Sequence, residues 1–250
     1  MKAFFQTDQG KVRSLNEDSG AVIPISASDV FAVVADGMGG HKAGDVASQM
    51  AVNYVKEHLD TYINDHEDTK GIIHSLIEDA NQDIFTYAQD HPDCYGMGTT
   101  IVLLRATEDE IHIGHVGDSR CYKVTQNSIE QLTDDHTLVN ELVKSGQITS
   151  EEAEYHPRKH VVLRALGTDP KVEIDNLKYT WEKGEYILLC SDGLSNKVTA
   201  ESFVKVINQD VSLEDKVARL ITMANEAGGE DNITLILVYN DVETEEGALT

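Results

Sequence analysis

Apolar and polar residues alternate along many short segments of the chain, and most of these segments are bounded by Gly, Asp or Asn. They are rich in Val, Ile, Thr and Tyr, a composition that favours β-strands. Eight segments are therefore predicted to be strands: SGAVIPI, DVFAVVAD, GTTIVLLRA, EIHIGHVG, RCYKVT, KVEIDNLKY, EYILLCSD and NITLILVY.

Two longer blocks have a different periodicity. In residues 43–63 and 69–89, apolar side chains recur every three or four positions, which predicts amphipathic helices. Two shorter helices are predicted at 199–208 and 212–227. Each of these opens on Ser or Thr and has acidic residues in its first turn.

The order of these elements indicates the fold class. Strands come in clusters and helices come in pairs, without the strict alternation of a doubly wound parallel sheet. We expect an α+β protein of mostly antiparallel sheets covered by helix pairs, with one domain over residues 1–241. The long polar segment 145–160 predicts a helical flap of about 144–161, and the acidic tail 242–250 is expected to be disordered.

Composition narrows the classes of partner. The 250 residues carry 20 Lys and Arg against 44 Asp and Glu, a formal charge of −24. Such a surface argues against nucleic acid or an anionic membrane as the main partner. The N-terminus lacks the apolar run of a signal peptide, and three cysteines without a CxxC spacing indicate a reducing, cytoplasmic compartment.

The segment AVVADGMGGHKAGD at 32–45 is the first sign of chemistry. A dinucleotide fingerprint would need Gly where Lys42 stands, and a P-loop would need Gly-Lys-Ser/Thr. Neither pattern is present. An aspartate, Asp36, instead ends an apolar strand among glycines, which indicates a bound cation rather than a nucleotide phosphate.

Three further aspartates stand next to predicted strands: Asp118, Asp192 and Asp231. A single Asp-Gly pair is usually only a turn. Four such carboxylates meeting at one rim of the sheets would need a cation between them. An all-oxygen ligand set suits Mg²⁺ or Mn²⁺, whereas zinc would recruit Cys or His.

Six ordered motifs connect the chain to a known family. They are RxxNED at 13–18, ADGMGG at 35–40, GTT at 98–100, GDSR at 117–120, SDG at 191–193 and EDN at 230–232. This series, which spans residues 7 to about 239, resembles the metal-dependent protein phosphatases of the 2C type, in the compact bacterial form. The resemblance implies two packed antiparallel sheets flanked by pairs of helices.

The resemblance also implies a metal site of two ions and a third, weaker position. Asp36 would bridge the two ions, with the carbonyl of Gly37 on one of them, and Asp118 would serve the third position with Asp192. Glu17 and Asp18 would hold metal-bound waters. The implied metal-site residues are Asp36, Gly37, Asp192, Asp231, Asp118, Glu17 and Asp18.

Other implied roles concern the substrate. Arg13 would grip two phosphate oxygens with its planar guanidinium, and Asn232 would contribute to substrate binding. Many family members have His directly after the Asp-Gly pair, where this chain has Met38. We hypothesise that His41 protonates or orients the leaving alkoxide instead.

Together these features predict a protein serine/threonine phosphatase. Two divalent ions lower the pKa of a water between them, so phosphoserine and phosphothreonine would be hydrolysed without a covalent phosphoenzyme. The alternatives are a catalytically silent regulator that binds metal or phosphopeptide, and a dedicated phosphatase of an anti-sigma antagonist.

The expected partners are phosphorylated proteins, including cognate Ser/Thr kinases, and the expected state is a monomer. The expected cofactors are Mn²⁺ or Mg²⁺. Glu151, Glu152 and Glu154 of the flap could favour basic sequences around a phosphosite, although a solvated acidic face is an equally good interpretation.

Overall fold

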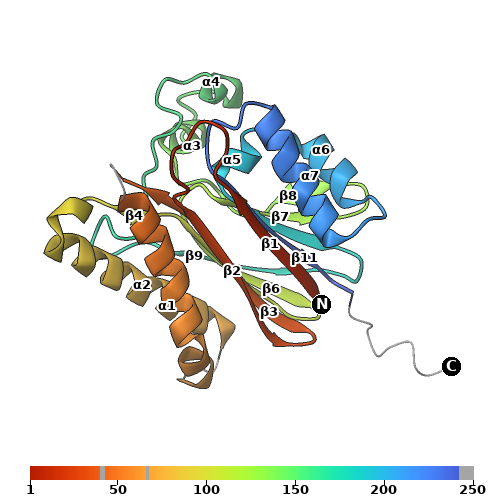
Figure 1. Ribbon diagram of the computed structural model, residues 1–250, viewed down its shortest axis with the longest axis horizontal. Coiled ribbons are helices and arrows are strands. Elements are labelled where there is room, and N and C mark those ends of the chain that lie inside the picture. The colour runs from red at the N-terminus through yellow and green to blue at the C-terminus, as the bar shows by residue number, and fades with distance from the viewer. Residues whose placement is uncertain (40–42, 66–67, 242–250) are drawn as a thin grey trace.

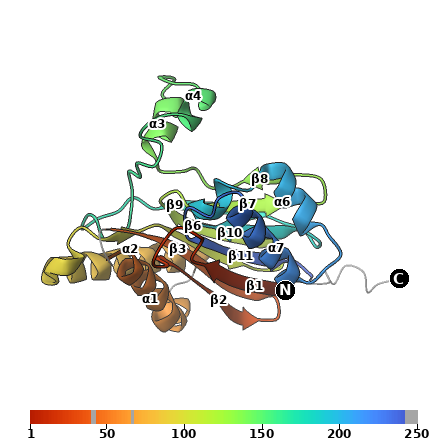
Figure 2. The same cartoon turned by 45° about the horizontal axis from the view of Figure 1, so that its top comes forward.

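The computed structural model describes residues 1–39, 43–65 and 68–241 and contains two antiparallel sheets packed face to face (Figures 1 and 2). In the first sheet the strand order is β1 (Lys2–Asp8), β11 (Ile233–Tyr239), β10 (Tyr186–Cys190), β7 (Arg120–Val124) and β8 (Ile129–Gln131). In the second it is β2 (Asp18–Ser26), β3 (Asp29–Met38), β5 (Ile101–Ala106), β6 (Glu110–Val116) and β9 (Asp175–Thr180). The short strand β4 (Gly98–Thr99) extends the pairing of β3 beyond β5.

A pair of helices covers the outer face of each sheet, so the order of layers is αββα (Figure 1). Helices α1 (Ala43–Asp65) and α2 (Thr69–Asp90) pack on the second sheet, while α6 (Ala200–Ile207) and α7 (Leu213–Glu226) pack on the first. Buried apolar side chains fill three layers, one under each helix pair and one between the sheets. The predicted α+β sandwich is confirmed.

The predicted helices are found within two residues of their expected ends, because local capping signals define them. Thr199 accepts a hydrogen bond from Ser202 N at the start of α6, and Ser212 accepts one from Asp215 N at the start of α7. Two very short helices lie outside these pairs and the flap, the 3-10 turn η1 (Pro92–Cys94) and α5 (Asp192–Ser195). No helix in the described ranges combines the length and apolarity needed to cross a membrane.

Two strands, β8 and β1, were not anticipated from the sequence. Strand β1 forms the edge of the first sheet and pairs along its whole length with β11, from Lys2 opposite Tyr239 to Asp8 opposite Ile233. Its side chains are only partly buried, so its apolar alternation is weak. The two partners lie at opposite ends of the chain, and only the folded arrangement brings them together.

The flap projects from the sandwich, as Figure 2 shows, and carries helices α3 (Leu138–Lys144) and α4 (Ser150–Glu154). It leaves the body at Thr137 and returns at Val162, and these two residues form a β-bridge at its base. The helical excursion therefore begins earlier than the predicted 144. Thr137 caps α3 by accepting from Asn140 N, and Thr149 and Glu152 form a capping box at α4.

Candidate active site

Strands β2 and β3 bring the first two carboxylates together. Asp18 begins β2 and lies directly opposite Asp36 near the end of β3. Asp36 is held by its backbone, because its N–H donates to Thr100 Oγ1 (2.9 Å) and its carbonyl accepts from Thr99 Oγ1 (2.9 Å). The ADG segment thus extends a buried strand and places Asp36 near the end of that strand.

The buried carboxylate of Asp18 is tied to the first sheet through Ser191. The Ser191 hydroxyl donates to Asp18 Oδ2 (2.7 Å) and accepts from Thr234 N (3.0 Å). Ser191 also precedes α5, whose first residue is Asp192. One hydroxyl therefore links a carboxylate of the second sheet to the strand ends of the first, a role that the SDG motif alone does not reveal.

Asp118 sits in the tight connection between β6 and β7. The preceding Gly117 has φ +112°, and a Cβ there would lie 2.5 Å from Thr100 Cγ2, so only glycine allows this turn. Ser119, which follows, shares a hydrogen bond with Thr100 (2.7 Å between hydroxyl oxygens). The same threonine thus contacts the turns that carry Asp36 and Asp118.

Close backbone approach also shapes the segment around Gly37. The Gly37 N–H donates to the Glu17 carbonyl (3.1 Å). A Cβ on Gly37 would collide with the Gly44 carbonyl and lie 2.6 Å from the Glu17 carbonyl. The start of α1, the segment at Glu17 and the end of β3 are therefore packed backbone against backbone.

The carboxylates lie close enough for their charges to interact. Burial raises the pKa of Asp36 well above its ordinary value, and the charges of Asp18, Asp192, Asp118 and Asp231 raise it further.

The neighbouring carboxylates behave in the same way. Burial raises the pKa of Asp18 to about 7, although hydrogen bonds from Ser191 and Thr234 oppose the shift. Burial, then the charge of Asp192, raises the pKa of Asp118 to about 7. The pKa of Asp192 is raised by burial and then by Asp231. Without a cation, these carboxylates lie together most easily when some of them are protonated. The cluster therefore suits a multivalent cation.

Arg13 lies at the edge of the cluster. Its Nη2 donates to Asp231 Oδ2 (2.8 Å), and its Nη1 lies 3.8 Å from Glu17 Oε2. Burial alone would lower the pKa of Arg13, but the charge and hydrogen bond of Asp231 outweigh it and the pKa is raised. The guanidinium stays charged and half exposed, beside Asp231 and Glu17.

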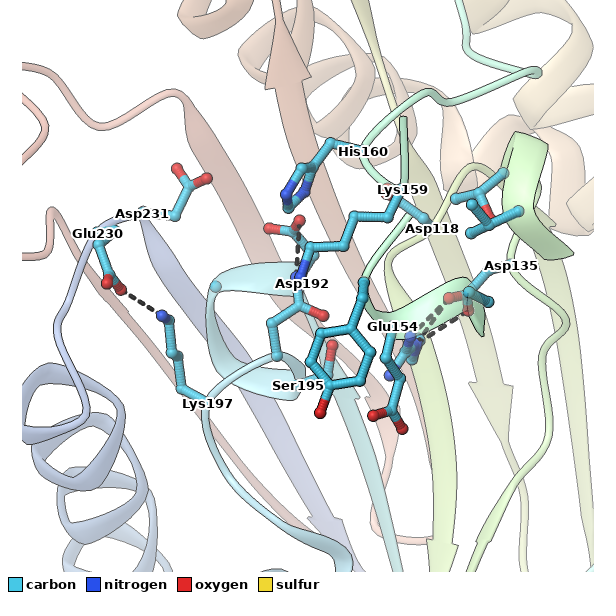
Figure 3. A pocket seen from close by; sticks show the side chains of 17 residues that line it. Asp118, Asp135, Glu154, Lys159, His160, Asp192, Ser195, Lys197, Glu230 and Asp231 are labelled. Atoms are coloured by element: carbon cyan, nitrogen blue, oxygen red, sulfur yellow. Dashed lines mark hydrogen bonds and ion pairs between the residues drawn. The ribbon is translucent and has the colours of Figure 1, made fainter. Parts of the chain in front are cut away.

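A cleft of about 800 Å³ opens above these groups and is lined by Asp118, Asp192 and Asp231 (Figure 3). The flap contributes the opposite wall with Tyr155 and His160. The His160 ring faces Asp192, whose pKa it lowers. No motif of the sequence indicated these flap residues, because they become site residues only through the return path of the flap.

Two predicted site residues need separate comment. The Asn232 side chain is buried, and its amide donates to the carbonyls of Gln9 and Leu15 and accepts from Glu17 N. This geometry favours a role in holding the loop that carries Arg13, and substrate contact by Asn232 stays a prediction. His41 lies outside the described residues, so its predicted role in protonation is carried forward unchanged.

Cys190 is not a nucleophile in this arrangement. It is fully buried in β10, and burial raises the pKa of its thiol to about 12. The thiol therefore stays protonated at neutral pH and cannot reach the cleft.

The family model for protein phosphatase 2C matches residues 7–234. The chain belongs to the protein phosphatase 2C family. It is 41% identical over 244 residues to the serine/threonine phosphatase stp of Listeria monocytogenes, which covers 97% of both chains. It is 38% identical over 248 residues to the protein phosphatase PhpP of Streptococcus pneumoniae, covering 98% of this chain and all of the relative.

The fold agrees with solved structures of the same family. Superposition on the serine/threonine phosphatase Stp1 of Staphylococcus aureus gives a TM-score of 0.88 at 35% identity, over 97% of this chain and 95% of that one. The protein is a metal-dependent serine/threonine phosphatase, and its substrates are phosphorylated proteins.

Proposed function

We propose that this phosphatase binds two Mn²⁺ or Mg²⁺ ions at the carboxylate cluster, with a third position at Asp118. The single observation that supports the proposal most strongly is the burial of Asp36, Asp18, Asp192 and Asp118 close to one another, because burial and then mutual repulsion raise the pKa of these carboxylates. The donor set is carboxylate and carbonyl oxygen, which fits hard divalent cations and not zinc.

Each residue then has a role in holding the ions. Asp36, at the centre of the cluster, would bridge the two ions, and the Gly37 carbonyl would bind one of them. Asp192 and Asp231 would complete the site from the first sheet. Glu17 and Asp18 would hold waters around the ions, in keeping with the Ser191 hydrogen bond that orients Asp18.

The bound cations supply Lewis acidity and lower the pKa of nearby water. The protein's own contribution is to bind and orient the phosphate. We infer that Arg13 exchanges its contact with Asp231 for two phosphate oxygens, because its guanidinium presents a planar fork and is paired with a residue that lines the cleft. His41 would protonate the leaving oxygen of serine or threonine.

The setting of the reaction is inferred on coarser grounds. We propose that residues 1–241 form one catalytic domain that acts as a cytoplasmic monomer and opposes Ser/Thr kinases, including a cognate kinase. Three free cysteines fit a reducing compartment. The flap wall of the cleft would contact residues beside the phosphosite, and Glu154 could favour a basic neighbour.

The deciding experiment measures phosphate released from a phosphothreonine peptide by chelator-treated enzyme, before and after addition of Mn²⁺. We expect turnover only with the metal, and loss of turnover in Asp36→Asn. Isothermal titration should count two tight Mn²⁺ sites in the wild type and fewer in the variant. Undiminished turnover of the fully chelated enzyme would refute the proposal.

A further inference from the structure

A single residue, His136, binds the turn that carries Asp118. It directly precedes Thr137, where the flap leaves the body, and is called here the outgoing root of the flap. The N–H of Gly117 donates to His136 Nδ1 (3.1 Å), and the carbonyl of Gly117 accepts from His136 N (2.8 Å). The His136 side chain is 3% exposed. Both main-chain groups of Gly117 are thus bound to one buried histidine, directly before the Asp118 carboxylate.

The same histidine closes the base of the flap. Its carbonyl accepts from Leu163 N (2.7 Å), and the next residue, Thr137, pairs with Val162 across the base. His136 therefore holds the Asp118 turn with its ring and, with its main-chain carbonyl, holds the segment on which the flap returns.

The hydrogen bond from Gly117 also sets the tautomer of the ring. A neutral imidazole that accepts at Nδ1 must carry its proton on Nε2, and burial lowers the pKa of His136. The Nε2–H then faces Asp175 Oδ2 at 3.3 Å.

Asp175, the first residue of β9, contacts both roots of the flap. One carboxylate oxygen, Oδ2, faces His136 at the outgoing root. The other, Oδ1, accepts from Arg164 Nη1 (3.2 Å) just after the returning root. A single carboxylate on the sheet thereby ties together two chain segments that are 28 residues apart.

A metal ion at this cluster is not the explanation. His115, His136 and Asp175 place possible ligand atoms within 4.8 Å of one another. The Nε2 lone pair of His136, however, is replaced by a proton, and the Arg164 guanidinium lies 3.3 Å from that atom. The His115 ring lies 4.7 Å from the His136 ring, and burial lowers its pKa to about 3. Asp175 joins His136 and Arg164 into one polar network.

We propose that His136 and Asp175 form a positioning unit that sets the Asp118 carboxylate and the flap root together, and thereby couples metal binding to recognition of the phosphoprotein. The inference rests on the proposed role of Asp118 as a metal ligand. Neither residue touches the reacting atoms. Their effect passes through Gly117 on one side and through the base of the flap on the other.

Two substitutions of His136 separate its contact with Gly117 from its contact with Asp175. In His136→Asn, the side-chain oxygen stands at the same branch position as Nδ1 and still accepts from Gly117, but nothing reaches Asp175. In His136→Phe the ring volume is kept while both hydrogen bonds are lost. Asp175→Asn keeps its shape, yet its one oxygen can no longer accept from both flap roots.

A matched control exists at the opposite end of the same sheet. Asp29 begins β3, and its carboxylate, which like that of Asp175 is partly buried, pairs with Arg105 at 2.7 and 3.1 Å. Asp29→Asn should lower the thermal midpoint to about the same extent as Asp175→Asn. It should leave the Mn²⁺ concentration for half-maximal turnover and the KM for the peptide unchanged. Any change that both variants share then comes from general destabilisation.

The test measures the Mn²⁺ concentration for half-maximal turnover of a small aryl phosphate, Mn²⁺ binding by calorimetry, and KM for a phosphothreonine peptide. We expect His136→Phe to weaken metal binding about tenfold and to raise peptide KM about tenfold. His136→Asn and Asp175→Asn should raise peptide KM to a similar degree with metal binding within about twofold of wild type. KM for the aryl phosphate should stay unchanged in both.

Failure of this inference is distinguishable from failure of the proposed function. If Asp118→Asn weakens Mn²⁺ binding while His136→Phe does not, the positioning unit is refuted and the metal role of Asp118 stands. If Asp118→Asn has no effect on metal binding, the proposed role of Asp118 is refuted instead. Peptide KM values in Asp175→Asn equal to those in Asp29→Asn would refute the link to the flap.

Discussion

The guanidinium of Arg13 donates to Oδ2 of Asp231 at 2.8 Å, although 218 residues separate the two in the chain. The residue proposed to hold the phosphate is therefore paired with a residue proposed to hold a metal ion. Under these roles, phosphate would take Arg13 from the pair and the metal ion would take Asp231. Binding at one side of the site changes the electrostatic environment of the other.

This pairing predicts that Arg13→Lys is not a conservative change. A lysine keeps the charge but cannot present two parallel N–H groups to phosphate. We expect kcat/KM for a phosphothreonine peptide to fall about 100-fold in Arg13→Ala, with Arg13→Lys between it and wild type. Calorimetric Mn²⁺ binding should change far less. Equal kcat/KM in all three proteins would contradict the assigned role.

Asp36 is predicted to be indispensable. Asp36→Asn keeps the size of the side chain but removes the charge at the centre of the cluster. Since loss of outer partners alone costs metal sites about 10- to 100-fold in affinity or activity, turnover should fall by more than 100-fold. As a control, Asp68→Asn alters an exposed N-cap of α2 far from the cleft and should retain full activity.

The metal-free protein should become less stable as pH rises. The pKa values of Asp18 and Asp118 are about 7 in the folded chain, against about 4 when unfolded. Between those values the folded state binds more protons, so stability falls with rising pH. Buried His115, with its lowered pKa, acts in the opposite direction, but it does so with or without metal.

The quantity to measure is therefore the difference in urea midpoint between Mn²⁺-loaded and chelated protein. This difference should grow from pH 5 to pH 7.5. As pH rises, the carboxylates of the chelated protein lose the protons that reduce their repulsion, whereas in the loaded protein the metal ions take the place of those protons. In Asp118→Asn the growth should be smaller. A difference that shrinks over this range would show that the carboxylates do not share a cation.

Gly37 is predicted to tolerate no side chain. A Cβ would collide with the backbone carbonyls of Gly44 and Glu17. Neither carbonyl can move without shifting the start of α1 or the segment before β2. Gly37→Ala should cost about 1–3 kcal/mol of unfolding free energy and should also weaken Mn²⁺ binding. Gly184→Ala, where no atom lies within 4 Å of the new Cβ, should cost about 1 kcal/mol from its positive φ alone and leave metal binding intact.

The predicted role of His41 is best tested with two leaving groups. An alkyl phosphate such as phosphothreonine needs its leaving oxygen protonated, whereas an aryl phosphate needs this far less. His41→Ala should reduce peptide hydrolysis about 100-fold, as expected for loss of a general acid, and reduce aryl phosphate hydrolysis much less. An equal loss for both substrates would assign His41 a role in structure or metal binding instead.

Some residues of the site could be predicted from the sequence, and others could not. The motif order pointed to Asp36, Asp192 and Asp231, because Asp36 and Asp192 follow apolar strand segments and precede glycine, while Asp231 comes just before the apolar strand that begins at Ile233. The flap residues Tyr155 and His160 had no such signal. Neither did Ser191, whose hydroxyl orients Asp18 from the other sheet, because a serine before Asp-Gly looks like any turn residue.

The sequence by itself determined the local elements and the chemistry of the ligands. Helix ends follow from capping side chains within three residues, and strand faces follow from alternation, so both are local properties. Tertiary structure alone decided which distant segments meet. The pairing of β1 with β11, the convergence of carboxylates from both sheets and the tie of Asp175 to both flap roots depend on packing between residues far apart in the chain. The raised pKa values arise from the same cause, because burial and mutual repulsion exist only once those segments are assembled.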